Sequence, residues 1–236
     1  MKKLILTAAA LALSTGFAMA DTVRMGTEGA YPPYNFINDK GEVDGFEREL
    51  GDLLCEKAGL TCEWVTNEWD SIIPNLLSGN YDTIIAGMSI TDERMETIDF
   101  TQNYIPPAAS AYAALSADAD LSGVVAAQVG TIQADYVAKS GATLLEFATL
   151  DDTVAAVKNG EADAVFADKD ALAPFVGSDM SWAGDDVPLG GGVGIGMRKS
   201  DAELKGKFDA VITEMKADGS LNAMIKKWFG DEATVF

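Results

Sequence analysis

The sequence predicts an α/β fold of two lobes joined by two crossing strands. Short apolar runs alternate with segments of helical periodicity up to about residue 100, and the same alternation starts afresh at Ser122. Between these halves, residues 108–115 form an extended run of small residues without a helical charge pattern. A second extended run at 190–196 leads back toward the C-terminal end. Two lobes connected in this way form a clamshell, whose cleft is a natural small-molecule site.

Residues 1–20 have the features of a cleaved export signal. Lys2 and Lys3 precede an apolar run, and the small-residue site 18–20 precedes Asp21. We expect the mature chain to begin at Asp21 and to be soluble. The formal net charge is −20, and it becomes −22 when the two lysines are removed.

Composition excludes several classes of function. A strongly acidic chain lacks the basic surface that nucleic acids and anionic membranes require, so we expect neither as a partner. The chain contains no histidine, which excludes Ser-His and Cys-His catalysis and removes the commonest zinc ligand. We expect no metal and no cofactor.

The first half begins with a strand at 22–27, and the loop 28–34 leaves its carboxyl end, where ligands bind in open α/β sheets. Apolar residues at helical spacing predict a helix from Phe46 to about Gly59. The remaining elements of this half are two apolar strands and a helix that stops at a glycine: strands 61–65 and 82–86 and helix 69–77.

The second half repeats this alternation. Its expected elements are apolar strands and periodic helices: strands 124–127, 143–147 and 162–166, and helices from about residue 133, at 150–159 and at 169–176. The segment 201–218 is an amphipathic helix, and a shorter helix follows through Trp228. Because one lobe interrupts the other, we expect these last helices to return to the first lobe. The predicted division is a first lobe at 21–107, a second lobe at 108–192 and a return segment at 193–236.

The stretch 84–94 runs from an apolar strand through small residues into a helix start, and it predicts an anion site. Thr91 is a good N-cap, and the free N–H groups of a helix start attract carboxylates and phosphates. Arg94 adds a guanidinium that can clamp a planar carboxylate with two hydrogen bonds. The alternative is a surface ion pair of Arg94 with Glu93 or Glu96.

The chain has two cysteines, Cys55 and Cys62. An even count in an exported chain favours a local disulfide, because an oxidising compartment preserves it. The alternative is two buried free thiols.

Five motifs resemble one known family. They are the strand and loop 23–34, the turn 43–47, the stretch 86–94, the cysteine spacing, and the run 194–199 before a helix. In their order and spacing they are similar to the periplasmic solute-binding proteins of polar amino acid ABC transporters, such as the lysine/arginine/ornithine-, histidine- and glutamine-binding proteins. The resemblance implies a type II periplasmic binding protein clamshell, a periplasmic location, ABC transporter permease subunits as partners and a monomer.

The resemblance also implies how the ligand α-carboxylate is held. Arg94, Ser89 and the backbone near Gly87 match the groups that bind it in the first lobe. In the second lobe, Thr131 and Gln133 match a turn whose backbone N–H caps the same carboxylate. An ordinary capped helix at this turn remains the alternative.

For the rest of the ligand, the resemblance implies five further positions. Asp168 matches the carboxylate that binds the α-ammonium, although a simple helix N-cap is also possible there. Glu28, Tyr31, Trp69 and Ala86 match positions around the ligand side chain. Tyr31 and Trp69 could sandwich an aliphatic stem or a guanidinium, whereas Trp69 could instead belong to the core. A carboxylate at Glu28 suits a distal cation, but relatives that bind neutral glutamine also have an acid there.

We therefore expect a non-enzymatic protein that captures a free polar L-amino acid for a permease. Basic amino acids rank first because a strongly negative protein attracts cations, and glutamine or another neutral polar amino acid ranks second. The alternative is a periplasmic enzyme on the same fold, similar to cyclohexadienyl dehydratases, in which Glu28 or Asp168 acts as a general acid beside Arg94. A ligand-sensing module is a third possibility.

Overall fold

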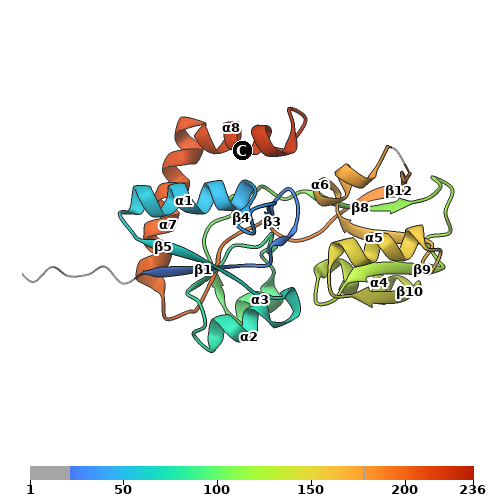
Figure 1. The fold of residues 1–236 in the computed structure, drawn as a ribbon, viewed down its shortest axis with the longest axis horizontal. Coiled ribbons are helices and arrows are strands. Elements are labelled where there is room, and N and C mark those ends of the chain that lie inside the picture. The colour runs from blue at the N-terminus through green and yellow to red at the C-terminus, as the bar shows by residue number, and fades with distance from the viewer. Residues whose placement is uncertain (1–21, 178) are drawn as a thin grey trace, which may run out of the picture.

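Two five-stranded β-sheets, each flanked by helices, form the molecule in a computed structural model that describes residues 22–177 and 179–236. Figure 1 shows them as two separate lobes with the strands in their interiors. The first lobe is the sheet β5-β1-β6-β13-β7 with its helices, and the second lobe is the sheet β10-β9-β11-β8-β12 with its helices. The predicted α/β two-lobe fold is confirmed. The predicted export signal lies outside the described residues.

The first sheet combines parallel and antiparallel strands. Its strands are β1 (Val23–Thr27), β5 (Cys62–Thr66), β6 (Thr83–Ile84), β7 (Asp99–Phe100) and β13 (Gly196–Met197). β1 pairs in parallel with β5 and β6, whereas β13 pairs antiparallel with β6 and β7. The sheet is thus completed by a strand from the far end of the chain, as the return of the C-terminal segment requires.

Helices flank the first sheet, and all of them except Asp92–Thr97 bury apolar side chains. They are α1 (Phe46–Ala58), α2 (Ile72–Leu77), α3 (Asp92–Thr97), α7 (Ala202–Asp218) and α8 (Ser220–Phe229). α1 buries Phe46, Leu50 and Leu54 and ends at Gly59, whose φ of 66° is the left-handed conformation that favours glycine at a helix end. α7 and α8 pack against α1. A 3₁₀ turn, η1 (Trp69–Ser71), precedes α2.

The second lobe has the same mixture of pairings. Its strands are β8 (Ala109–Ala114), β9 (Val124–Gln128), β10 (Thr143–Phe147), β11 (Ala164–Asp168) and β12 (Ser181–Pro188). β9 is parallel to β10 and β11, and β8 is antiparallel to β11 and β12. The helical elements are α4 (Ile132–Ser140), α5 (Leu150–Lys158), α6 (Lys169–Leu172) and the 3₁₀ turn η2 (Ala173–Phe175).

The two connections between the sheets pair with each other. Ile105 and Val193 exchange backbone hydrogen bonds of 3.0 and 3.4 Å, and Tyr104 N donates to Val193 O at 2.8 Å. The run 108–115, expected to cross between the lobes, enters the second sheet as β8, so the crossing itself precedes it. Paired connections of this kind suit a hinge, because they bend together.

Some elements were not predicted. The loop expected at 28–34 contains β2 (Ala30–Tyr31), which forms a small sheet with β3 (Asn35–Ile37) and β4 (Val43–Asp44). Strands of two or three residues are too short to show an alternating pattern. β12 was missed because its register shifts between Ala183 and Val187, which breaks the alternation of side chains.

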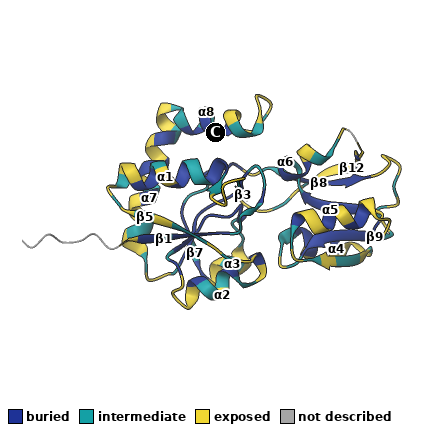
Figure 2. Cartoon of the chain, viewed as in Figure 1, coloured by how far each residue is buried: buried dark blue, intermediate teal, exposed yellow. Residues whose placement is uncertain are grey.

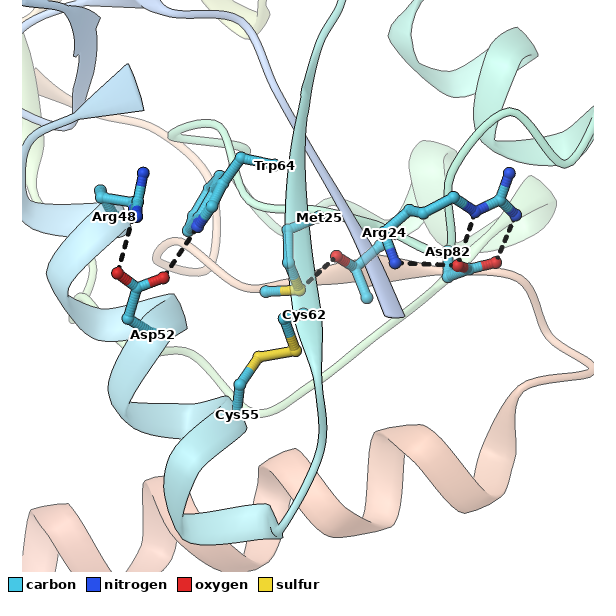
Figure 3. Close-up of a disulfide and its surroundings, with 9 residues drawn as sticks. Arg24, Met25, Arg48, Asp52, Cys55, Cys62, Trp64 and Asp82 are labelled. Carbon is cyan, nitrogen blue, oxygen red and sulfur yellow. Dashed lines mark hydrogen bonds and ion pairs between the residues drawn. A yellow bond between two sulfur atoms is a disulfide. The ribbon is translucent and has the colours of Figure 1, made fainter. Parts of the chain in front are cut away.

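The predicted disulfide joins Cys55, near the end of α1, to Cys62, the first residue of β5, with 6.2 Å between the Cα atoms (Figure 3). Trp64 Nε1 also connects these elements by donating to Asp52 Oδ1 at 2.9 Å. Together these contacts fix the helix against the edge strand of the first sheet.

Burial follows the layers of each lobe. The inner strands of each sheet are largely buried, the edge strands β5, β10 and β12 are more exposed, and the outward faces of the helices are exposed (Figure 2). None of the helices in the described part of the chain has the length and apolar character that crossing a bilayer requires.

Candidate functional site

A cavity lined mainly by polar residues lies between the two lobes. Its walls include all ten residues predicted to bind ligand, together with Gln128 and Ile132. Most of these residues lie at or just beyond the carboxyl ends of β1, β6, β9 and β11. Ligands of open α/β sheets bind at these ends, because the strand connections there are free to present polar groups.

Arg94 supplies the positive charge of the cavity. Thr91 is the predicted N-cap of α3, and its Oγ1 accepts from Arg94 N at 3.1 Å. The guanidinium donates to the carbonyl of Ser89 at 2.8 Å and, across the cleft, to the carbonyl of Gly130 at 3.3 Å. Burial lowers the pKa of Arg94, but an arginine remains charged at any physiological pH.

The alternative of a surface ion pair for Arg94 is wrong for the described residues, since none of their carboxylates lies within 4.0 Å of its guanidinium. Its charge is instead opposed by neutral carbonyl oxygens and an aromatic face. A cation without a carboxylate partner is available to a ligand anion.

Trp69 lies against this arginine. The guanidinium carbon of Arg94 is 5.4 Å from the centre of the indole ring, a cation–π arrangement. Trp69 also packs with Ile72, Leu76 and Met88 in a buried cluster of the first lobe. It therefore both lines the cavity and belongs to the core, which unites the two alternatives that the sequence left open.

The start of α4 faces the cavity from the second lobe. Thr131 is its N-cap, with Oγ1 accepting from Ala134 N at 3.1 Å. The N–H groups of Ile132 and Gln133 belong to the first turn, where a helix offers them no internal acceptor. Arg94 and this helix start therefore present hydrogen-bond donors to the same space, as an anion site requires.

Gly87 and Ala86 form the floor on the first-lobe side. Gly87 has a φ of 62°, and a Cβ there would lie 3.3 Å from the Tyr31 ring. Its N–H donates to Glu47 Oε1 at 2.6 Å and is therefore already engaged. Ala86 is buried beside it and also lines the cavity.

Asp168 is the first acidic group of the cavity. Its side chain accepts from Tyr31 OH at 2.8 Å and from Gln133 Nε2 at 2.9 Å. It occupies the N-cap position of α6 but makes no capping hydrogen bond, so the side chain is committed to the cleft. Burial raises the pKa of Asp168 to about 6, while the hydrogen bond from Tyr31 acts in the opposite direction.

Glu28 is the second acidic group. Gln128 Nε2 donates to Glu28 Oε1 at 2.6 Å across the cleft and to the carbonyl of Ala148 at 3.0 Å. Burial raises the pKa of Glu28 to about 7, against the effect of the hydrogen bond from Gln128. Sequence reasoning assigned no role to Gln128 or to Ile132. Their positions at a strand end and at a helix start are the signals that could have found them.

One fixed cation, a helix start and two carboxylates thus line a single cavity between the lobes. Two α/β lobes that enclose such a polar space define a bilobal solute-binding protein. The chain belongs to the bacterial extracellular solute-binding proteins, family 3, which it matches over residues 23–231. This membership identifies a binding protein rather than an enzyme.

Individual relatives are similar over nearly their whole lengths. The L-arginine-binding protein of Pseudomonas aeruginosa is 34% identical over 97% of each chain. The lysine/arginine/ornithine-binding periplasmic protein of Escherichia coli is 31% identical over 97% of each chain. The crystal structure of a periplasmic His/Glu/Gln/Arg/opine family-binding protein from Silicibacter pomeroyi, in complex with lysine, is 75% identical and superposes with a TM-score of 0.90, covering 91% of this chain and all of that one.

Proposed function

We propose that this protein captures a free basic L-amino acid between its lobes and delivers it to an ABC transporter permease. The proposal depends on one observation: a single cavity contains one set of carboxylate-binding donors, at Arg94 and the start of α4, and two carboxylates, Asp168 and Glu28. A basic amino acid has one carboxylate and two cationic groups, so each group finds a partner of opposite charge. Arginine, lysine, ornithine and histidine rank first as ligands, and glutamine or another neutral polar amino acid ranks second.

The α-carboxylate binds Arg94 and Ser89 on the first lobe and the start of α4, with Thr131 and Gln133, on the second. This assignment is supported by the donors that converge there. Because the two lobes both contribute, the carboxylate also stabilises the closed form.

The α-ammonium binds Asp168, which lines the cavity together with Ala86 and Gly87. Tyr31 and Gln133 orient the carboxylate by donating to its two oxygens. An ammonium in this position forms a charge-assisted hydrogen bond with an acceptor that needs no rearrangement.

The distal cation of the ligand binds Glu28, and its stem lies between Tyr31 and Trp69. The lysine complex of the 75% identical relative and the names of the arginine-binding relatives support a basic ligand. The buried pair of Glu28 and Gln128 supports it independently, because a cation that enters there compensates the cost of burying the carboxylate.

The family supports the transport setting. We propose that the mature chain acts as a periplasmic monomer, that its permease binds the closed form, and that the lobes divide at residues 21–107, 108–192 and 193–236. The strand order supports this division, because the second sheet is built from strands between 109 and 188 and the first sheet from strands on either side.

Isothermal titration of the ligand-stripped protein with arginine, lysine, ornithine, histidine, citrulline and glutamine tests the proposal. We expect one site per chain and tighter binding of arginine than of its uncharged analogue citrulline. Binding confined to neutral amino acids would overturn the basic-ligand assignment. Absence of binding across the panel, with product formed from prephenate or arogenate, would replace the transport function by the dehydratase alternative.

A further inference from the structure

Glu47 is a buried carboxylate that does not line the cavity. It lies in the first turn of α1, and none of its surface is exposed. A carboxylate in such a place is costly unless several donors compensate it. Its partners therefore indicate what it does.

Three donors converge on Glu47. Gly87 N donates to Oε1 at 2.6 Å, Asn35 Nδ2 donates to Oε2 at 2.7 Å, and the Tyr104 hydroxyl donates to Oε1. One of these, Gly87, is part of the cavity floor. Charge-assisted hydrogen bonds to a backbone N–H fix the peptide plane, so Glu47 sets the orientation of this floor from behind.

Asn35 extends the connection to the other side of the cavity. Its Oδ1 accepts from Gly29 N at 2.7 Å, while its Nδ2 donates to Glu47. Gly29 directly follows Glu28, so the backbone that carries Glu28 is fixed through Asn35. Because the amide of Asn35 has one acceptor and one donating group in use, its orientation is determined by Glu47.

We propose that Glu47 is a positioning residue, although it touches no ligand. It fixes the position of Gly87 on the cavity floor relative to the Glu28 loop, which is the backbone of Glu28 and Gly29. This inference rests on the proposed amino-acid binding. One carboxylate then controls two parts of the cavity. Gly87 faces the groups common to all amino acids, whereas the Glu28 loop faces the ligand side chain.

Glu47→Gln separates this role from simple packing, because the side chain keeps its shape. The amide presents an NH₂ group where the carboxylate accepted from three donors, of which only the Tyr104 hydroxyl can also accept. In one orientation the NH₂ group of the introduced amide faces the N–H of Gly87, and in the other it faces the NH₂ group of Asn35. If Asn35 then flips to offer its oxygen, its own NH₂ group faces the N–H of Gly29. Each arrangement leaves a buried donor without an acceptor at one of the two cavity parts.

The test is calorimetric titration of arginine and glutamine into the full-length mature protein and its variants, well below their melting temperatures. For Glu47→Gln we expect Kd to rise about tenfold or more for both ligands, with a stoichiometry of one. For Asn35→Ala we expect the preference for arginine over glutamine to fall about fivefold, while glutamine affinity changes little. Glu56→Gln, an exposed substitution in the same helix, is the matched control and leaves both Kd values unchanged.

A second readout does not depend on affinity. The amide proton of Gly87 donates to a charged acceptor, so its NMR resonance should move upfield in Glu47→Gln if that contact is weakened. Wild-type affinities retained by folded Glu47→Gln would overturn the inference and leave the proposed function intact. If Glu47→Gln does not fold, unchanged selectivity in Asn35→Ala overturns it. Failure of the wild-type protein to bind either amino acid would instead refute the proposed function.

Discussion

Tyr31 in the first lobe donates a hydrogen bond to Asp168 in the second, with 2.8 Å between the two oxygen atoms. The family resemblance placed both residues at the ligand, but it did not bring them into contact. The bond joins the short strand β2 to the end of β11 and crosses the cleft. A ligand ammonium that reaches Asp168 thus meets a carboxylate that the opposite lobe has already oriented.

Removal of the cation at Arg94 should abolish recognition of every amino acid. Arg94→Ala deletes the group that faces the ligand carboxylate, so we expect Kd for arginine and glutamine to rise about hundredfold or more by calorimetry. Arg48→Ala is the control, because Arg48 pairs with Asp52 on the outer surface of α1. Loss of arginine binding with glutamine binding retained would contradict this role.

Trp69 should act through Arg94. Because the indole lies under the guanidinium, Trp69→Leu frees Arg94 to move, and we expect affinities for charged and neutral ligands to fall together by about three- to tenfold. Trp64→Leu is a matched control, since Trp64 packs under Arg48 away from the cavity. A loss restricted to arginine and lysine would show that Trp69 acts only through its contact with the ligand stem and not through Arg94.

Arginine binding should strengthen as pH rises through neutrality. Burial raises the pKa of Glu28 from 4.5 to about 7, and a cationic ligand favours the ionised form. The apparent Kd for arginine should therefore fall about tenfold from about pH 6 to about pH 8, relative to citrulline. Citrulline is the reference because the pKa of Asp168, about 6, affects both ligands. In Glu28→Gln this additional dependence should vanish.

The same shift affects the ligand-free protein. The folded state holds the Glu28 proton more tightly than the unfolded chain does, so folding stability from this group declines as pH rises from about 4.5 to about 7. Thermal unfolding of wild type and Glu28→Gln across this range measures the difference. A wild-type melting temperature that rises more steeply with pH than that of the variant would have the wrong sign.

Gln128 should tune this response. Its hydrogen bond lowers the pKa of Glu28, so Gln128→Leu should move the midpoint of the arginine pH dependence to higher pH and weaken binding near pH 7. Calorimetry at several pH values locates the midpoint. A midpoint that stays in place would separate Gln128 from the titration of Glu28.

The disulfide should contribute to stability without affecting binding. Cys55 and Cys62 are seven residues apart and lie outside the cavity lining. Closing so short a loop contributes about 2 kcal/mol in the chain-entropy description, so Cys55→Ser with Cys62→Ser should lower the melting temperature by several degrees. The Kd for arginine should stay within about twofold, since such changes are additive with a distant site.

The alternation of apolar runs and helical periodicity was enough to predict the α/β lobes, because long periodic elements such as α1 and α7 bury one continuous face. It could not predict β2, β3 and β4, whose few residues are fixed by their neighbours. Residue type also predicted Thr91 as an N-cap, since capping is decided within four residues of chain.

Contacts between distant residues were beyond the sequence. The stacking of Trp69 on Arg94 and the bond between Gln128 and Glu28 depend on how two elements meet. The same holds for Glu47, whose motif was recognised in the turn 43–47 but whose partner Gly87 lies 40 residues away. Tertiary geometry decided each of these relationships.

The hydrogen bonds that cross the cleft have a consequence for the rate of transport. Tyr31 with Asp168, Gln128 with Glu28, and Arg94 with the Gly130 carbonyl are all made by groups that line the cavity. The groups that would bind the ligand are thus also the groups that hold the two lobes together. A substitution that changes ligand preference must therefore also change the rate at which the lobes separate. Substitutions that strengthen ligand binding at these positions slow the release of the ligand.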